Sequence, residues 1–104
     1  MARNLTDIRI WLEGKIAANE QRVSLKDATI SHYLEDCDMC YAAKCSLASA
    51  EHDFGEAGLL GRTIDSYLLE LEEKIARLRE ERAEAFCRVE TYKTWLEALE
   101  ALEG

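Results

Sequence analysis

Proline is absent from this chain of 104 residues, and three of its 5 glycines fall in one short stretch, Gly55, Gly58 and Gly61. Proline is the strongest breaker of a helix interior, so its absence leaves long stretches free to stay helical. No alternation of apolar and polar residues typical of strands is visible, and neither is an internal repeat. The sequence therefore predicts an all-α protein.

Long hydrophobic runs are also lacking. No run approaches the roughly 18 uncharged apolar residues that a membrane-crossing helix needs. Charged residues such as Arg3, Asp7 and Arg9 interrupt the hydrophobic residues near the start of the chain. We therefore expect no membrane association, a cytoplasmic location and reduced cysteines.

Recognisable catalytic and nucleotide-binding motifs are missing too. The glycine cluster does not match a phosphate-binding loop, and no serine lies in a nucleophile-elbow context. The net charge of −8 argues against direct binding of nucleic acid, because phosphates are held by clustered Lys and Arg. We expect a non-enzymatic protein without a cofactor.

What the sequence does contain is a three-then-four spacing of apolar residues in its second half. Ten of eleven positions are apolar or aromatic: Ile64, Leu68, Leu71, Ile75, Leu78, Arg82, Ala85, Val89, Tyr92, Leu96 and Leu99. This heptad pattern predicts one long helix, here called the seam helix, that packs side by side with another helix.

Capping signals suggest where the helices begin. Asn4 with Asp7 and Ser24 with Asp27 each resemble a helix start, and Thr63 resembles a cap for the seam helix. We predict a single domain over 1–104, with helices at about 5–21, 25–54 and 63–102 and a glycine-rich turn at 55–61. A break between the first two helices is expected near residues 20–25, and the first helix is expected to bury one broad face: Leu5, Ile8, Trp11, Leu12 and Ile16.

An antiparallel hairpin centred on residue 58 would define which residues face each other. This arithmetic places Arg82 beside Glu35 or Asp38, which we predict as its ion-pair partners. The second helix would bury one stripe: Ile30, Leu34, Cys37, Tyr41 and Ala48.

Several apolar side chains remain for packing beyond the hairpin. The first helix could fold back on them as a three-helix bundle, or two hairpins could form a four-helix homodimer, and we expect both to contribute. The packing and dimer residues predicted are Trp11, Leu71, Leu78, Phe86, Trp95 and Leu99.

Three cysteines form a C-x2-C-x4-C pattern, Cys37, Cys40 and Cys45, with Cys87 far along the chain. Helical spacing does not bring four sulfurs within reach of one metal ion, so we favour buried apolar side chains over a metal site or a regulatory disulfide. The three clustered cysteines stay as weak metal candidates.

Excess negative charge concentrates in one region. Residues 35–73 hold ten acids and two bases, and this stretch alone sums to −8. We predict a protein-interaction module whose acidic hairpin tip attracts a partner protein of basic character. The predicted tip residues are Glu51, Asp53, Glu56, Leu59, Leu60, Asp65 and Glu70.

Two other functions remain open from the sequence. One is a small acidic inhibitor that acts as a decoy, in which carboxylates stand in for phosphates and block a basic nucleic-acid-binding protein. The other is a redox or metal switch that uses the clustered cysteines.

Overall fold

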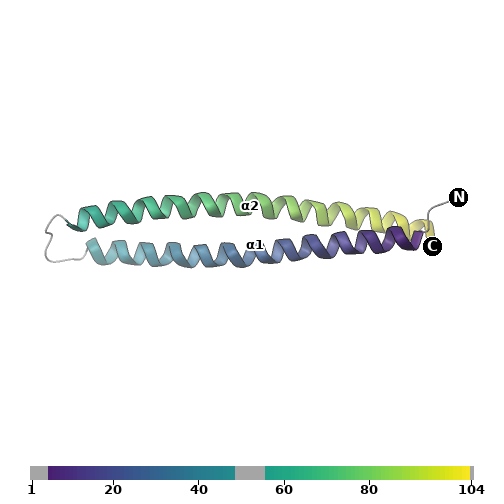
Figure 1. Cartoon of the computed structure of the whole chain (residues 1–104), viewed down its shortest axis with the longest axis horizontal. Coiled ribbons are helices and arrows are strands. Elements are labelled where there is room, and N and C mark those ends of the chain that lie inside the picture. Colours follow the sequence, from purple (N-terminus) through teal and green to yellow (C-terminus); the bar gives the residue numbers. More distant parts are fainter. Residues whose placement is uncertain (1–4, 49–55, 104) are drawn as a thin grey trace. The chain divides into compact units, whose positions relative to one another are not determined.

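Two long helices make up the fold. The computed structural model describes residues 5–48 and 56–103, without the side chains of 56 and 57. Helix α1 spans Leu5–Ala48 and helix α2 spans Glu56–Glu103, and the described residues contain no strand (Figure 1). The predicted all-α hairpin of two long helices in contact is confirmed.

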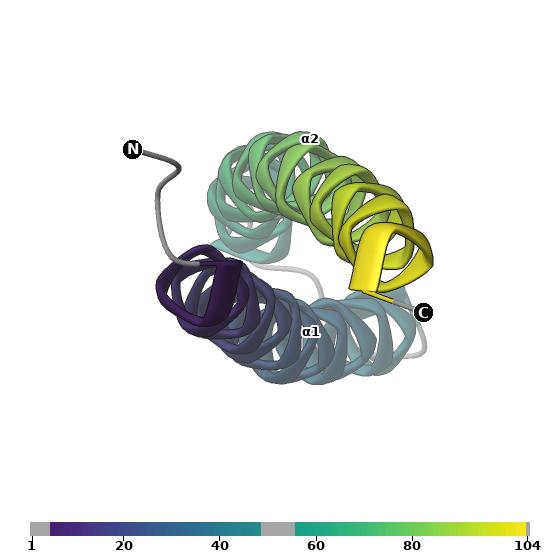
Figure 2. The same cartoon turned by 90° about the vertical axis from the view of Figure 1, so that its right-hand side faces the viewer.

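The chain divides into two compact units, and each unit contains one segment of α1 and one segment of α2. Of the described residues, unit 1 contains 5–27 and 80–103, and unit 2 contains 28–48 and 56–79. Within unit 1, the first turns of α1 and the last turns of α2 form a single layer of two helices (Figure 2). One face of each helix is therefore packed, while its outer face carries no other described segment. The prediction of a single domain stays a prediction.

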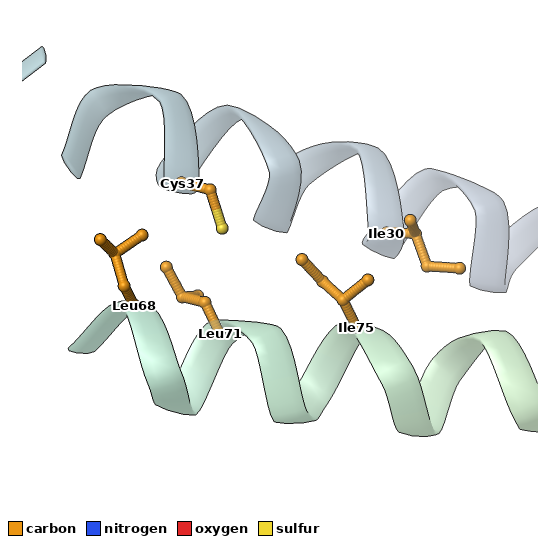
Figure 3. Packing of buried hydrophobic residues seen from close by; sticks show 5 residues of the cluster. All are labelled: Ile30, Cys37, Leu68, Leu71 and Ile75. Atoms are coloured by element: carbon orange, nitrogen blue, oxygen red, sulfur yellow. The ribbon is translucent and has the colours of Figure 1, made fainter. Parts of the chain in front are cut away.

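The predicted seam of α2 is confirmed residue by residue. All eleven of its positions are buried or half-buried. Among the other described α2 residues, only Gly61 and Glu81 are half-buried. In unit 2 the seam meets α1 in one apolar cluster, in which Leu71 is 1% exposed (Figure 3). The cluster consists of Ile30, Cys37, Leu68, Leu71 and Ile75.

Helix α1 presents a complementary stripe with the same three-then-four spacing. It is buried or half-buried at Leu12, Ile16, Asn19, Val23, Lys26, Ile30, Tyr33, Cys37, Cys40, Lys44 and Leu47. Because this stripe contains an amide and two lysines, it does not stand out as apolar. The predicted stripe was wrong for Leu34, Tyr41 and Ala48, which are exposed.

The predicted break near residues 20–25 was wrong, because α1 is continuous through Ser24. This stretch has neither proline nor glycine, and Val23 and Lys26 continue the contact with α2 on either side of Ser24. The separate N-terminal helix and the three-helix arrangement are therefore not found.

The predicted glycine-rich turn was also wrong for residues 56–61, since α2 begins at Glu56 and includes Gly58 and Gly61. Gly61 is half-buried and extends the seam spacing by one step before Ile64. Thr63 does not cap the helix start, because its Oγ1 donates to the Leu59 carbonyl at 3.0 Å within the helix. The predicted helix ends at Phe54 and Gly55 lie outside the described residues.

The helix register differs from the prediction as a result. Arg82 Nε lies 2.5 Å from Asp27 Oδ1, so the predicted partners Glu35 and Asp38 were wrong. The prediction centred the turn on residue 58, which lies inside α2. When the two helices are aligned by the pair of Arg82 and Asp27, the residue of α1 that faces Arg82 lies closer to the N-terminus than the prediction placed it.

The first helix does not bury the broad face that was expected. Leu12 is buried and Ile8 and Ile16 are half-buried, but Leu5 and Trp11 are exposed. One neighbouring helix covers only a narrow stripe of α1, so side chains at its margin stay in contact with solvent.

Candidate interaction surface

The predicted tip residues that the structure describes do not share one face of α2. Leu59, Leu60, Asp65 and Glu70 are all exposed on α2 in unit 2. At 100° per residue, Leu59 and Glu70 share an outer face but lie eleven residues apart, while Leu60 and Asp65 project to opposite sides of the helix. Glu51, Asp53 and the side chain of Glu56 lie outside the described residues.

Asp65 is already engaged within unit 2. Its Oδ1 lies 2.5 Å from Lys44 Nζ, which reaches out from the packed stripe of α1. The hydrogen bond to Asp65, reinforced by its negative charge, raises the pKa of Lys44. The ammonium therefore neutralises the charge of this carboxylate locally.

Unit 2 contains a shallow groove of about 280 Å³ along one side of the helix pair. Its floor is apolar, and Asp38, Glu72 and Arg79 supply its charged groups. The lining side chains are Leu34, Cys37, Asp38, Tyr41, Glu72, Ile75, Ala76 and Arg79. The Tyr41 hydroxyl donates to Glu72 Oε1 at 3.5 Å, so the two helices are bridged across it.

A second groove of about 250 Å³ runs on unit 2 with a different lining. It is lined by Asp36, Met39, Cys40, Ala43, Ile64 and Tyr67. Both grooves therefore combine exposed apolar side chains with acidic ones. The sequence reasoning missed the first groove because it assigned Leu34 and Tyr41 to the buried stripe.

The clustered cysteines do not converge. Cys37 is buried, Cys40 is half-buried and Cys45 is exposed. Burial raises the pKa of the Cys37 thiol, and the neighbouring Cys40 and Glu72 raise it further, which disfavours the thiolate needed for metal binding or nucleophilic attack. No group of three or more Cys, His, Asp or Glu side chains within the described ranges is arranged to hold a metal ion.

The predicted packing residues separate into two groups. Leu71 and Leu99 are buried and Leu78 is half-buried in the contact between α1 and α2, whereas Trp11, Phe86 and Trp95 are about half exposed. The exposed group therefore remains available for contacts outside the chain.

Two of the exposed aromatic residues join a small cluster in unit 1. Tyr92 packs edge-on against Trp11 and Trp95, with ring centroids 5.9 Å and 5.4 Å apart. Lys15 Nζ lies 5.7 Å from the centre of the Trp11 ring. This cluster fixes the orientation of Trp11 at the margin of the packed stripe.

Comparison with known protein families, curated proteins and solved structures finds no match to this chain. Over residues 5–48 and 56–103, neither helix has a segment long and apolar enough to cross a lipid bilayer. The arguments for function therefore come from the surfaces described above.

Proposed function

We propose that this chain is a non-enzymatic, cytoplasmic protein-interaction module that binds a partner protein through unit 2. The observation that carries the proposal is the groove lined by Leu34, Tyr41 and Glu72, where exposed apolar side chains adjoin carboxylates. Such a combination suits a partner that inserts an apolar anchor and places a basic group beside it.

The partner that fits this groove best is an amphipathic helix with Lys or Arg on the margin of its apolar face. Its apolar residues would cover Leu34 and Tyr41, and its basic residues would approach Asp38 and Glu72. The net charge of −8 would accelerate encounter with a basic protein over a range limited by salt.

The first turns of α2 would extend this binding surface. Leu59, Leu60 and Glu70 are exposed there, and Glu51, Asp53 and Glu56 add negative charge to the same part of the sequence. Asp65 would contribute least, because Lys44 already holds it.

Two neighbouring acids allow a matched test of the groove. Glu72 lines the groove and Glu73 does not, so Glu72→Lys and Glu73→Lys make the same charge change at different faces of one helix. Tagged chains carrying each substitution would be used to capture proteins from the native cell, with identification by mass spectrometry.

We expect a partner that is retained by the original chain and by Glu73→Lys, and is reduced at least tenfold by Glu72→Lys. Equal retention by both variants, or equal loss, would contradict binding at the groove. Raising the salt concentration separates the modes of binding: a steep loss of capture would favour the acidic decoy, whereas a retained complex would favour apolar docking.

A further inference from the structure

Between Ile10 and Leu25, the outer face of α1 in unit 1 carries no Asp, Glu, Lys or Arg. We call it the uncharged face, and it consists of eight exposed positions, with Trp11 at its edge beside Tyr92 of α2: Ile10, Trp11, Gly14, Ala17, Ala18, Gln21, Ser24 and Leu25. Ile10 and Leu25 are each 60% exposed, and Trp11 is 52% exposed. Large apolar side chains thus stand at the two ends of a stretch of small residues.

The outer face of α2 in the same unit has a different composition. Its outward positions include Glu84, Glu90 and Glu97, all of them exposed. A helix that packs on one side normally turns charged residues to solvent on the other, as α2 does. A helix without charged residues on its outer side instead resembles one with a neighbour on each side.

Gly14 supplies a second observation. A Cβ placed there would meet no atom within 4 Å, so nothing in the described structure requires a glycine at this position. Glycine in a helix interior costs roughly 1 kcal/mol relative to alanine. Close approach of another backbone is the usual compensation for such a residue.

We propose that a second copy of this chain packs its own α1 against the uncharged face. The contact runs from Ile10 to Leu25, with the backbones closest at Gly14, Ala17 and Ala18. It gives the homodimer that we expected from the sequence a specific contact face, and it uses none of the residues that line the groove of unit 2.

The distribution of charge around the uncharged face favours a second copy of this chain as its binding partner. Two chains of net charge −8 repel each other, and a face without charged side chains is where their approach costs least. The residues beside this face carry opposite signs on its two sides, with Glu13 and Glu20 on one side and Lys15 and Arg22 on the other.

These flanking charges also fix the orientation of the two copies. Across a two-fold axis parallel to the helices, the acidic side of one α1 faces the basic side of the other. Glu13 then lies near Lys15 of the second copy, and Glu20 lies near Arg22. Glu13, Lys15 and Arg22 hold no ion pair among the described residues, whereas Glu20 Oε1 already lies 3.6 Å from Lys93 Nζ, so the contact between Glu13 and Lys15 is the stronger of the two.

Sedimentation equilibrium of the purified full chain tests the contact. We expect a dimer at micromolar concentration, and Ala18→Glu should raise its dissociation constant at least tenfold. Ala83→Glu is the matched control, because Ala83 is an exposed alanine on the outer face of α2 in the same unit. Far-UV circular dichroism would verify that both variants keep their helices.

A monomeric original chain, or equal weakening by Ala18→Glu and Ala83→Glu, would overturn the proposal. Because no partner protein is present, such a result would not affect the test of the groove with Glu72→Lys.

Charge reversal tests the orientation. Glu13→Lys and Lys15→Glu should each weaken the dimer by about threefold or more, and the double variant should restore it, because each copy then offers the reversed pair to the other. Residues two apart on one helix do not face each other, so recovery cannot arise within one chain. A double variant that is as weak as the two single changes combined would overturn the parallel arrangement.

Discussion

Units 1 and 2 use the same spacing of contacts but fill it with different chemistry. In unit 2 the buried cluster is wholly apolar and includes Leu71, the most buried large side chain of the described residues. In unit 1 the packed stripe contains Asn19, Lys26 and Arg82 alongside apolar residues. Unit 1 also buries apolar side chains, among them Leu12, Val89 and Leu99, so its polar groups add a means of aligning the helices to an apolar contact.

The polar side chains of the packed stripes follow one rule in both units. In unit 1, Lys26 Nζ lies 2.6 Å from Glu81 Oε2 on the other helix, and in unit 2, Lys44 Nζ lies 2.5 Å from Asp65 Oδ1 on the other helix. Long basic side chains can bury their stems and keep the charge at the margin, where an acid meets it. Asn19 is too short to do this, and it is 3% exposed.

The largest expected effect comes from the apolar cluster of unit 2. Leu71→Ala should lower the free energy of unfolding by about 2–5 kcal/mol, because it leaves a cavity between the helices. Leu69→Ala removes the same atoms from a side chain that is 58% exposed, and should change stability by less than about 0.5 kcal/mol. Urea unfolding followed by circular dichroism measures both, and similar losses would contradict the assigned packing face.

Asn19 allows a test in unit 1 in which a substitution is expected to increase stability. Its Nδ2 donates to the Lys15 carbonyl at 2.8 Å, but its Oδ1 is buried without a hydrogen-bond partner. Asn19→Leu should therefore raise the free energy of unfolding by about 1–3 kcal/mol. Thr91→Leu, at an exposed position of α2 in the same unit, should leave it nearly unchanged. Destabilisation by Asn19→Leu would contradict the comparison between the two units.

The alkylation rates of two thiols, one in each unit, test the assigned burial. Burial raises the pKa of the Cys37 thiol, so below pH 9 Cys37 should react with iodoacetamide at least about tenfold more slowly than the exposed Cys87. The folded chain keeps the Cys37 proton above pH 9.0, the ordinary pKa of the thiol, while the unfolded chain loses it. The free energy of unfolding should therefore fall as the pH rises past 9.

Mass spectrometry of the alkylated chain measures the two rates, and Cys37→Ala serves as the control for the pH dependence. This variant should lose part of the decrease in stability above pH 9. Equal alkylation of Cys37 and Cys87 in the folded chain would contradict the burial of Cys37.

The smallest expected effect concerns the ion pair of Arg82 and Asp27. Arg82 is half-buried, but its side chain is still 41% accessible to solvent and that of Asp27 is 50% accessible, so the pair should contribute less than about 1 kcal/mol. A double-mutant cycle with Arg82→Met and Asp27→Asn isolates this coupling, and the value should decrease at high salt. A coupling above about 2 kcal/mol would show that unit 1 depends on this pair for stability as well as for alignment.

Sequence reasoning predicted α2 well because its seam repeats without interruption. Ten of the eleven positions are apolar or aromatic, and a helix is the one structure that brings them onto a single face. Helix α1 was harder to predict, because Asn19, Lys26 and Lys44 interrupt its apolar pattern. If the three-then-four spacing had been extended through these polar residues, it would have predicted one continuous helix.

The candidate site was less accessible to sequence reasoning. The acidic region was evident from composition, but the sequence does not say which acids lie free and which, like Asp65, are held by a base of the other helix. The groove at Leu34 and Tyr41 depends on the rotation of α1 about its axis, because a rotation by one position would bury both side chains.

The sequence by itself determined that this protein is helical and which face of α2 is packed, because heptad spacing and the absence of proline are local properties of the chain. Only the tertiary structure decided the alignment of the helices and the exposed face of α1. Alignment depends on which residues meet across the hairpin, as Arg82 meets Asp27, and such contacts join residues far apart in the sequence.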